Sequence, residues 1–177
     1  MRVCGVIAEY DPFHRGHLYH FSRAKELTGA DFMVCVLGGA FSQRGEAMLF
    51  QTFDRARMAL ENGFDIAVGM PLSFSCAQAN RFARGGVGIL HQMNLVSHLS
   101  FGCETVRLDW LETAADIMNR PDGGYVMKLR EGLATGQSFA KAQGKALSEA
   151  MPELPESLIS SPNFILGLSY IRELKRL

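Results

Sequence analysis

The sequence has no excess of either charge, and this limits the partners it can attract. Eighteen basic residues balance eighteen acidic ones in a chain of 177 residues. No global field draws the chain to nucleic acid, so any polyanion has to be met by a local patch or by other parts. Apolar residues at 47% and charged residues at 20% exclude a disordered or collagen-like chain. The length fits one buried core, with or without a small helical appendage.

Cysteine is scarce, and the few cysteines lie far apart. They are Cys4, Cys35, Cys76 and Cys103. No two of them have the spacing of a metal site or of a redox-active pair. The sequence therefore predicts reduced, mostly buried thiols, as is typical of a cytoplasmic protein. We expect the chain to contribute no metal-ligand set.

Long apolar runs are also missing, which bears on targeting and on membranes. The first segment is apolar only as far as Ala8, and it has neither a basic leader nor a small-residue cleavage site. We therefore expect a buried first strand rather than a signal peptide. No later run approaches the length of a membrane span, so we expect no membrane partner.

The first part of the chain alternates short apolar runs with segments of helical periodicity. Continuous apolar strands are expected where helices cover both faces of a parallel sheet. We therefore predict an α/β fold with right-handed crossovers, and Gly29 and Gly63 are expected as C-caps of the first two helices. The predicted strands are 3–8, 32–37, 66–70 and 96–101, and the predicted helices between them are 18–28, 52–62 and 77–93.

Beyond Glu104 the pattern becomes helical, and no strand is expected. Ser138 is a suitable N-cap for one of these helices. We expect 1–108 to form a Rossmann-like nucleotide-binding core and 109–177 to form a helical extension of the same domain. The last helix has no cap at its end, so the natural chain is expected to continue. The helical pieces are 111–119, 125–132, 139–150 and 163–177.

The most informative segment is Gly-Val-Ile-Ala-Glu-Tyr-Asp-Pro-Phe-His-Arg-Gly-His-Leu-Tyr-His at positions 5–20. A strand that leads through a turn into a helix N-terminus offers unpaired amides and a positive dipole end to a phosphate. Pro12 fixes the turn, and Gly16 lets a phosphate approach the backbone without a Cβ in the way. His14 and His17 stand three apart, so both imidazoles are expected on one face, where they could hold the oxygens of a reacting phosphate.

A structural interpretation of the same histidines stays open. One or both could simply cap the helix or bond a nearby carbonyl, which is the more frequent role of an isolated histidine. The context favours the phosphate site, because the motif directly follows a buried strand and opens a helix. His20 is expected to be a satisfied structural histidine.

Four landmarks in order resemble the bacterial tRNA(Met) cytidine acetate ligases, within the HIGH-type nucleotidyltransferase superfamily. Positions 9–20 match the pattern Glu-Tyr-Asn-Pro-Phe-His-x-Gly-His-x-x-His except at Asp11. Positions 41–46 resemble Phe-x-Gln-Arg-Gly-Glu, positions 101–104 resemble Phe-Gly-Ser-Glu, and positions 161–167 resemble Ser-Pro-Asn-Asn-Ile-Leu-Gly. The resemblance implies a Rossmann-like HIGH-type nucleotidyltransferase domain followed by a helical C-terminal segment.

The resemblance further implies a ligase that uses ATP, with Mg²⁺, to activate acetate as acetyl-adenylate. Such an enzyme then acetylates N4 of the wobble cytidine of elongator tRNA(Met). His14 and His17 would be the catalytic residues, since attack on the α-phosphate needs positioning and charge neutralisation. The residues that would hold ATP are Ile7, Ala8, Glu9, Tyr10, Asp11, Pro12, Phe13, His14, Arg15, Gly16, His17, Leu18, Tyr19, His20, Gly102 and Asn163.

Arg44 is a candidate for contact with a second substrate. It follows the second predicted strand, where its guanidinium could reach a substrate carboxylate or the tRNA backbone. The alternative is an ordinary surface ion pair with Glu46.

Several positions depart from the family pattern. Asp11 replaces an asparagine and would place a carboxylate where the ATP phosphates are expected. Ala40 also replaces an asparagine, and Gly69 and Met70 stand where the family has Glu-Leu. The second nucleotidyltransferase motif, Ile-Ser-Ser-Thr-x-Ile-Arg, does not occur in the sequence.

These departures leave two other functions open. One is a binding or regulatory module that keeps the nucleotide but has lost turnover. The other is a nucleotidyltransferase with a different acceptor, such as pantetheine phosphate or a nicotinate nucleotide, although the landmarks after residue 40 argue against it. The sequence gives no signal for an oligomeric state.

Overall fold

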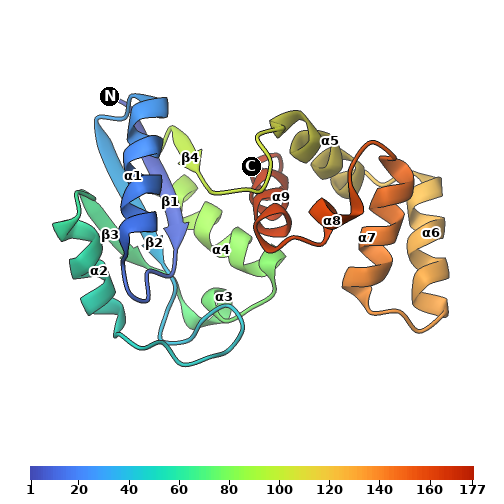
Figure 1. Ribbon diagram of the computed structural model, residues 1–177, viewed down its shortest axis with the longest axis horizontal. Helices are drawn as coiled ribbons and strands as arrows, with labels where there is room; N and C mark the ends of the chain where they lie inside the picture. Colours follow the sequence, from blue (N-terminus) through green and yellow to red (C-terminus); the bar gives the residue numbers. More distant parts are fainter. The chain divides into compact units, whose positions relative to one another are not determined.

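The computed structural model describes all residues from 1 to 177. The chain forms two compact units, Met1–Gly102 and Cys103–Leu177. The first holds the sheet and the second is helical (Figure 1). Each unit is described by itself below.

A four-stranded parallel sheet forms the centre of the first unit, with the strand order β3-β2-β1-β4. The register places Val3 beside Phe32 and Cys4 beside His98. All carboxyl ends therefore lie at one edge, which is where ligands bind in open α/β sheets. The strands are β1 Val3–Ala8, β2 Phe32–Leu37, β3 Ile66–Gly69 and β4 His98–Ser100.

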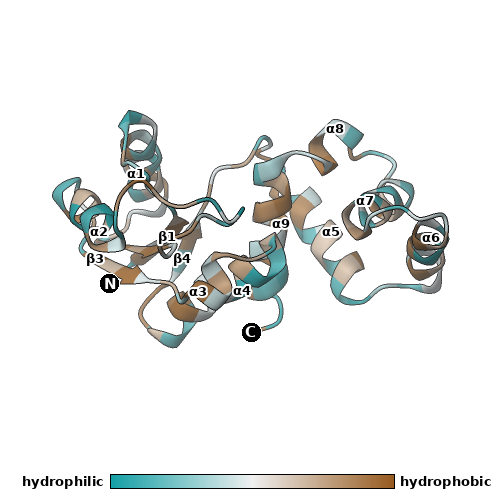
Figure 2. Ribbon diagram, turned by 90° about the horizontal axis from the view of Figure 1, so that it is seen from below, coloured by the Kyte–Doolittle hydropathy of each residue, from teal (hydrophilic) through white to brown (hydrophobic).

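Helices cover both faces of this sheet. Figure 2 shows α1 and α2 on one face and α3 and α4 on the other. The two central strands are consequently buried, with Cys4, Met33 and Cys35 fully inaccessible. This confirms the predicted α/β fold with a parallel sheet. The helices are α1 Arg15–Thr28, α2 Thr52–Glu61, α3 Leu72–Ser75 and α4 Ala79–Gln92.

The boundaries differ from prediction mainly where caps decide them. The first helix begins at Arg15 rather than at 18, because the His14 side chain caps it. Gly29 is the predicted C-cap and has a φ of 59°. The C-cap of α2 is Asn62, so the prediction of Gly63 was wrong by one residue; Gly63 follows with a φ of 106°. The predicted helix 77–93 is α4, preceded by the separate short α3.

The second unit is a helical array without strands, as predicted. Helix α6 packs against α7, and α5 packs against α9. A Cβ added at Gly132 would lie 2.8 Å from Cβ of Ala142, so α6 and α7 approach closely there. Ser138 caps α7 by accepting a bond from the Lys141 amide at 3.4 Å. The helices are α5 Leu108–Asn119, α6 Gly123–Ala134, α7 Phe139–Ala150, α8 Glu156–Ile159 and α9 Pro162–Leu174.

The cysteines divide into two pairs by environment. Cys4 and Cys35 lie in the central strands, where burial raises the pKa of both thiols, that of Cys35 to about 12. Cys76 is exposed and Cys103 is half-buried, because each lies in a connection outside the core. All four are free, but the expectation of mostly buried thiols was wrong for these two. None of the helices combines the length and apolar character needed to cross a bilayer.

Candidate functional site

The turn between β1 and α1 is anchored by aromatic packing. Tyr10 has a φ of 53°, in the left-handed region that costs a non-glycine residue roughly 1–3 kcal/mol. Its buried ring lies with centroid distances of 4.8 Å to Phe13, 4.7 Å to His17 and 5.9 Å to Phe64. Burial also raises the pKa of the Tyr10 hydroxyl, which stays neutral. The following bond, Asp11–Pro12, is cis. This packing holds the unusual backbone in place directly before the helix.

His14 and His17 cap the start of α1 reciprocally. Nδ1 of His14 accepts hydrogen bonds from the amides of Gly16 at 3.0 Å and His17 at 3.4 Å. Nδ1 of His17 accepts one from the amide of His14 at 3.3 Å. The two rings stack with centroids 3.6 Å apart and planes inclined by 20°. The capping interpretation and the shared-face expectation are therefore both correct for these residues.

The caps fix which ring nitrogens remain available. A nitrogen that accepts a backbone amide carries no proton, so the proton of each neutral imidazole is on Nε2. No hydrogen bond within the chain uses Nε2 of His14 or of His17. Each Nε2–H is thus left without a hydrogen-bond acceptor within the chain. The arrangement presents two adjacent hydrogen-bond donors at a helix N-terminus.

Burial and neighbouring imidazoles keep part of this site uncharged. The pKa of His17 is lowered to about 4, first by burial and then by His14 and His20. Burial also lowers the pKa of His20, whose Nε2 lies 3.0 Å from Oγ of Ser100 on β4. At neutral pH His17 is therefore a neutral donor, and His20 ties α1 to the sheet.

Gly16 is needed for the cap itself. A Cβ at this position would lie 2.9 Å from Cε1 and 3.1 Å from Nδ1 of His14. We predicted that the glycine leaves room for a phosphate. In this structure the imidazole of His14 occupies the space beside Gly16.

The loop after β2, residues 38–50, is fastened to the motif. Oε1 of Glu9 accepts the amide of Gln43 at 2.7 Å. The two carboxylate oxygens of Asp11 accept the amides of Leu49 at 2.6 Å and Phe50 at 2.8 Å. Both carboxylates of the motif thus serve the 38–50 loop in this structure.

Arg55 on α2 donates hydrogen bonds to backbone groups at the carboxyl ends of both β1 and β2. Its side chain is fully buried, and its guanidinium donates to the carbonyls of Glu9 at 2.6 Å, Gly38 at 2.9 Å and Gly39. Further bonds reach the Phe50 carbonyl at 3.1 Å and Oγ1 of Thr52 at 3.3 Å. Burial lowers the pKa of Arg55, while the nearby Asp11 and Glu9 oppose the shift.

Arg44 lies at the tip of the 38–50 loop. A bridge between Phe41 and Ala47 closes this tip, and the amide of Arg44 donates to Oγ of Ser42 at 3.2 Å. The guanidinium is exposed and forms no ion pair, so the alternative pairing with Glu46 is not made. It is free to meet an anion.

In the second unit, two of the sequence landmarks meet. Oε1 of Glu104 accepts the amide of Asn163 at 3.1 Å, at the N-terminus of α9. Partial burial raises the pKa of Glu104, but bonds from its own backbone, Asn163, Ser161 and Phe164 outweigh this and lower it. Gly102, the last residue of the first unit, is exposed.

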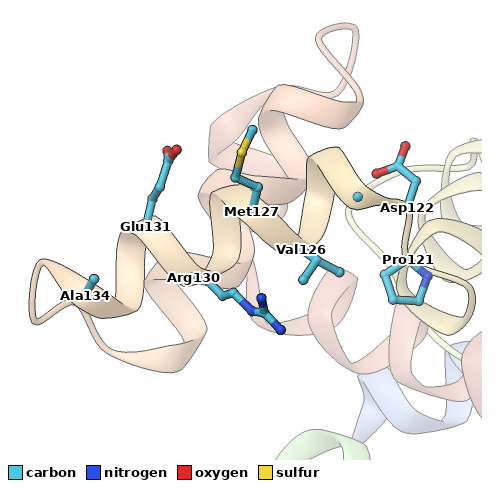
Figure 3. Close-up of a pocket in the computed structure, with 8 residues that line it drawn as sticks. Pro121, Asp122, Val126, Met127, Arg130, Glu131 and Ala134 are labelled. Carbon is cyan, nitrogen blue, oxygen red and sulfur yellow. The ribbon is translucent and has the colours of Figure 1, made fainter.

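Neither the depression along α6 nor a cluster of metal ligands provides a second candidate for an active site. A shallow depression runs along α6 and is lined by residues such as Val126, Met127 and Arg130 (Figure 3). It belongs to the second unit, and no histidine, cysteine or serine lines it. No group of three or more His, Cys, Asp or Glu side chains is placed to bind a metal ion.

Comparison with known families decides the assignment. A family model described as HIGH Nucleotidyl Transferase matches residues 1–177. The chain belongs to this family. Among its relatives in the HIGH nucleotidyl transferase family, the tRNA(Met) cytidine acetate ligase of Acetivibrio thermocellus is 40% identical over the whole chain and 43% of its own length. That of Halothermothrix orenii is 37% identical, over the whole chain and 44% of its own length.

Solved structures agree with this membership of the HIGH nucleotidyl transferase family. Thermotoga maritima TmcAL bound with alpha-thio ATP matches with a TM-score of 0.93 and 36% identity, over 99% of this chain and 44% of that one. The apo form matches with a TM-score of 0.94 and 36% identity, over 99% and 43%. The chain thus spans less than half the length of the relatives it matches.

Two residues that hold the predicted segments in place, Arg55 and Glu104, were not predicted from the sequence. Arg55 directly follows Asp54 and stands two positions before Arg57, so the sequence carries no local signal that its guanidinium is buried. Glu104 was read only as part of a landmark. Its cap on Asn163 has no local signal, because the two residues are 59 positions apart.

Proposed function

We propose that this chain binds ATP, with the reacting phosphates at the N-terminus of α1. The observation that carries the proposal is the stacked pair of His14 and His17, whose Nε2–H groups are the free donors of the motif. Donors with fixed direction cost no reorganisation when charge develops on a phosphate oxygen. The ATP analogue in Thermotoga maritima TmcAL supports this choice of nucleotide.

The electrostatics of the helix end favour an anion. The first turn of α1 contains no acidic residue, and Arg15 is its first residue. The positive end of the helix dipole is met by imidazoles rather than by a carboxylate. No negative charge in the first turn of α1 therefore balances the positive end of its dipole, and a phosphate would supply that charge.

The reaction that fits this site is activation of acetate followed by transfer to tRNA(Met). An acetate oxygen attacks the α-phosphorus, the bond from that phosphorus to the bridging oxygen breaks, and acetyl-adenylate and pyrophosphate result. The cytidine N4 amine then attacks the acetyl carbonyl, loses a proton and releases AMP. The names of the relatives support this proposal, in which this chain performs the nucleotide part.

Other residues have more limited roles in the proposal. Arg44, exposed and unpaired at the loop tip, would meet the carboxylate or the RNA backbone. The contacts of Gly102 and of Asn163 with the nucleotide stay predictions. The chain has no grouped metal ligands, so Mg²⁺ would arrive on the ATP phosphates, as is usual for this ion.

Calorimetric titration with MgATP tests the proposal. Wild type is compared with the double variant His14→Ala, His17→Ala and with the control His91→Ala, which removes an exposed histidine from α4. We expect saturable binding by wild type and by the control. The double variant should bind at least about 100-fold more weakly, since two charge-assisted bonds of about 1.5–3 kcal/mol each are lost.

Turnover is tested separately by acetate-dependent exchange of labelled pyrophosphate into ATP. Exchange would support adenylate formation by the chain. Binding without exchange would favour the module that keeps the nucleotide and lacks turnover, and equal binding by wild type and the double variant would refute the site.

A further inference from the structure

Both oxygens of the Asp11 carboxylate accept backbone amides of the 38–50 loop. Oδ2 accepts the amide of Leu49 at 2.6 Å and Oδ1 accepts that of Phe50 at 2.8 Å. These two amides lie directly before α2, at the exit of the loop. One side chain of the motif therefore holds two successive peptide groups from a distant part of the chain.

This arrangement requires a carboxylate rather than an amide. A carboxylate presents two acceptor oxygens, whereas the side chain of asparagine presents one acceptor and one donor. With asparagine at position 11, one backbone N–H would face an NH₂ group and lose its partner. The departure from the family's asparagine is thus matched by a specific pair of bonds.

The rest of the loop is held by neighbouring bonds. Gln43 donates its amide to Glu9, and Arg55 donates to the carbonyls of Glu9 and Gly38. Within the loop, Met48 donates to Ala40 at 3.0 Å. Asp11 holds the amides at the end of the loop, where Arg55 also donates to the Phe50 carbonyl at 3.1 Å, and the other bonds hold its beginning and middle.

We infer that Asp11 is a positioning residue, which locks the exit of the 38–50 loop to the nucleotide motif and does not direct its charge at the phosphates. The part of this inference that concerns phosphates rests on the proposed function. The part that concerns the loop does not. The carboxylate of Asp11 accordingly has a structural role at the exit of the loop.

The test uses Asp11→Asn, with Asp65→Asn as a matched control. Asp65 also accepts a backbone amide, that of Met33 at 2.7 Å, but at the opposite end of the strands. Amide hydrogen exchange and ¹H–¹⁵N spectra are recorded for wild type and both variants, together with MgATP titrations. Thermal melts establish that each variant is folded.

In Asp11→Asn we expect exchange at Leu49 and Phe50 to accelerate about tenfold or more, because a bond to a charged acceptor is lost. The resonances of these two amides should shift, while that of Met33 shifts only in Asp65→Asn. ATP affinity should not rise. Unchanged exchange at Leu49 and Phe50 would refute the role of Asp11 in holding the exit of the loop. Tighter ATP binding by Asp11→Asn would show that the charge of Asp11 does act on the phosphates. Absence of ATP binding by wild type would instead refute the proposed function.

Discussion

Helices α1 and α9 both begin with a cap supplied by a side chain, but the two caps differ in charge. At α1 the acceptors are the imidazoles of His14 and His17, and no acidic residue lies in the first turn. At α9 the acceptor is the carboxylate of Glu104. The dipole of α9 is thereby neutralised from within the chain, whereas that of α1 is left for an external anion. The two helix ends thus differ in the charge that the chain itself places at them.

The largest effect is expected where the chain supports the segment that leads into α1, at the buried guanidinium of Arg55. Arg55→Met removes every donor to the carbonyls of Glu9, Gly38 and Gly39 while keeping an unbranched side chain. We expect the free energy of unfolding to fall by about 3–5 kcal/mol, because several buried acceptors lose their partner. Urea denaturation measures this change. Arg57→Met, an exposed arginine on the same helix, should change it by less than about 0.5 kcal/mol.

A loss below about 1 kcal/mol in Arg55→Met would show that the ends of β1 and β2 are held by other contacts. The position of these strand ends would then not depend on the guanidinium of Arg55.

A second test gives α1 the kind of cap found at α9, a carboxylate. His14→Asp keeps a good N-cap but introduces a carboxylate, and His14→Asn is its neutral counterpart. Both should unfold within about 1 kcal/mol of each other, while His14→Asp should bind MgATP about tenfold more weakly than His14→Asn owing to the added charge. Calorimetry and thermal melts give the two quantities. Equal affinities would mean that no phosphate lies near this cap.

The neutral state of His17 gives a pH dependence. Its folded pKa of about 4 lies below the ordinary value of 6.5, so the unfolded chain binds a proton between these values that the folded chain does not. Stability should therefore decrease as the pH falls from 6.5 towards 4. After allowance for partial exposure, we expect His17→Asn to lose about 1–2 kcal/mol less than wild type over this range. Denaturation at pH 7 and 4.5 measures this difference, and parallel losses would contradict the assignment.

The smallest effect is expected at α9. Glu104→Gln weakens the cap and removes the charge at the helix end, at a cost of about 0.5–1 kcal/mol at pH 7. The folded pKa of Glu104 is lowered, so its contribution is present above the ordinary value of 4.5 and disappears as the pH falls through the folded pKa. Thermal melts of both proteins should thus converge in acid. A constant difference would show that the charge is not involved.

The sequence allowed the sheet and the place of the motif to be predicted, because both depend on local periodicity. The strands 3–8 and 32–37 were predicted at their observed bounds. The partners of Asp11 and Arg55 could not be predicted, since 38 and 46 positions separate Leu49 from Asp11 and Arg55 from Glu9. A local pattern identifies a carboxylate or a guanidinium. Only the fold determines which backbone groups it meets.

The reciprocal bonds of His14 and His17 make the same two imidazoles responsible for the start of a helix and for the donors at its end. Loss of either imidazole costs folding stability as well as a donor. Substitution of either histidine should therefore lower the free energy of unfolding and the affinity for a phosphate together.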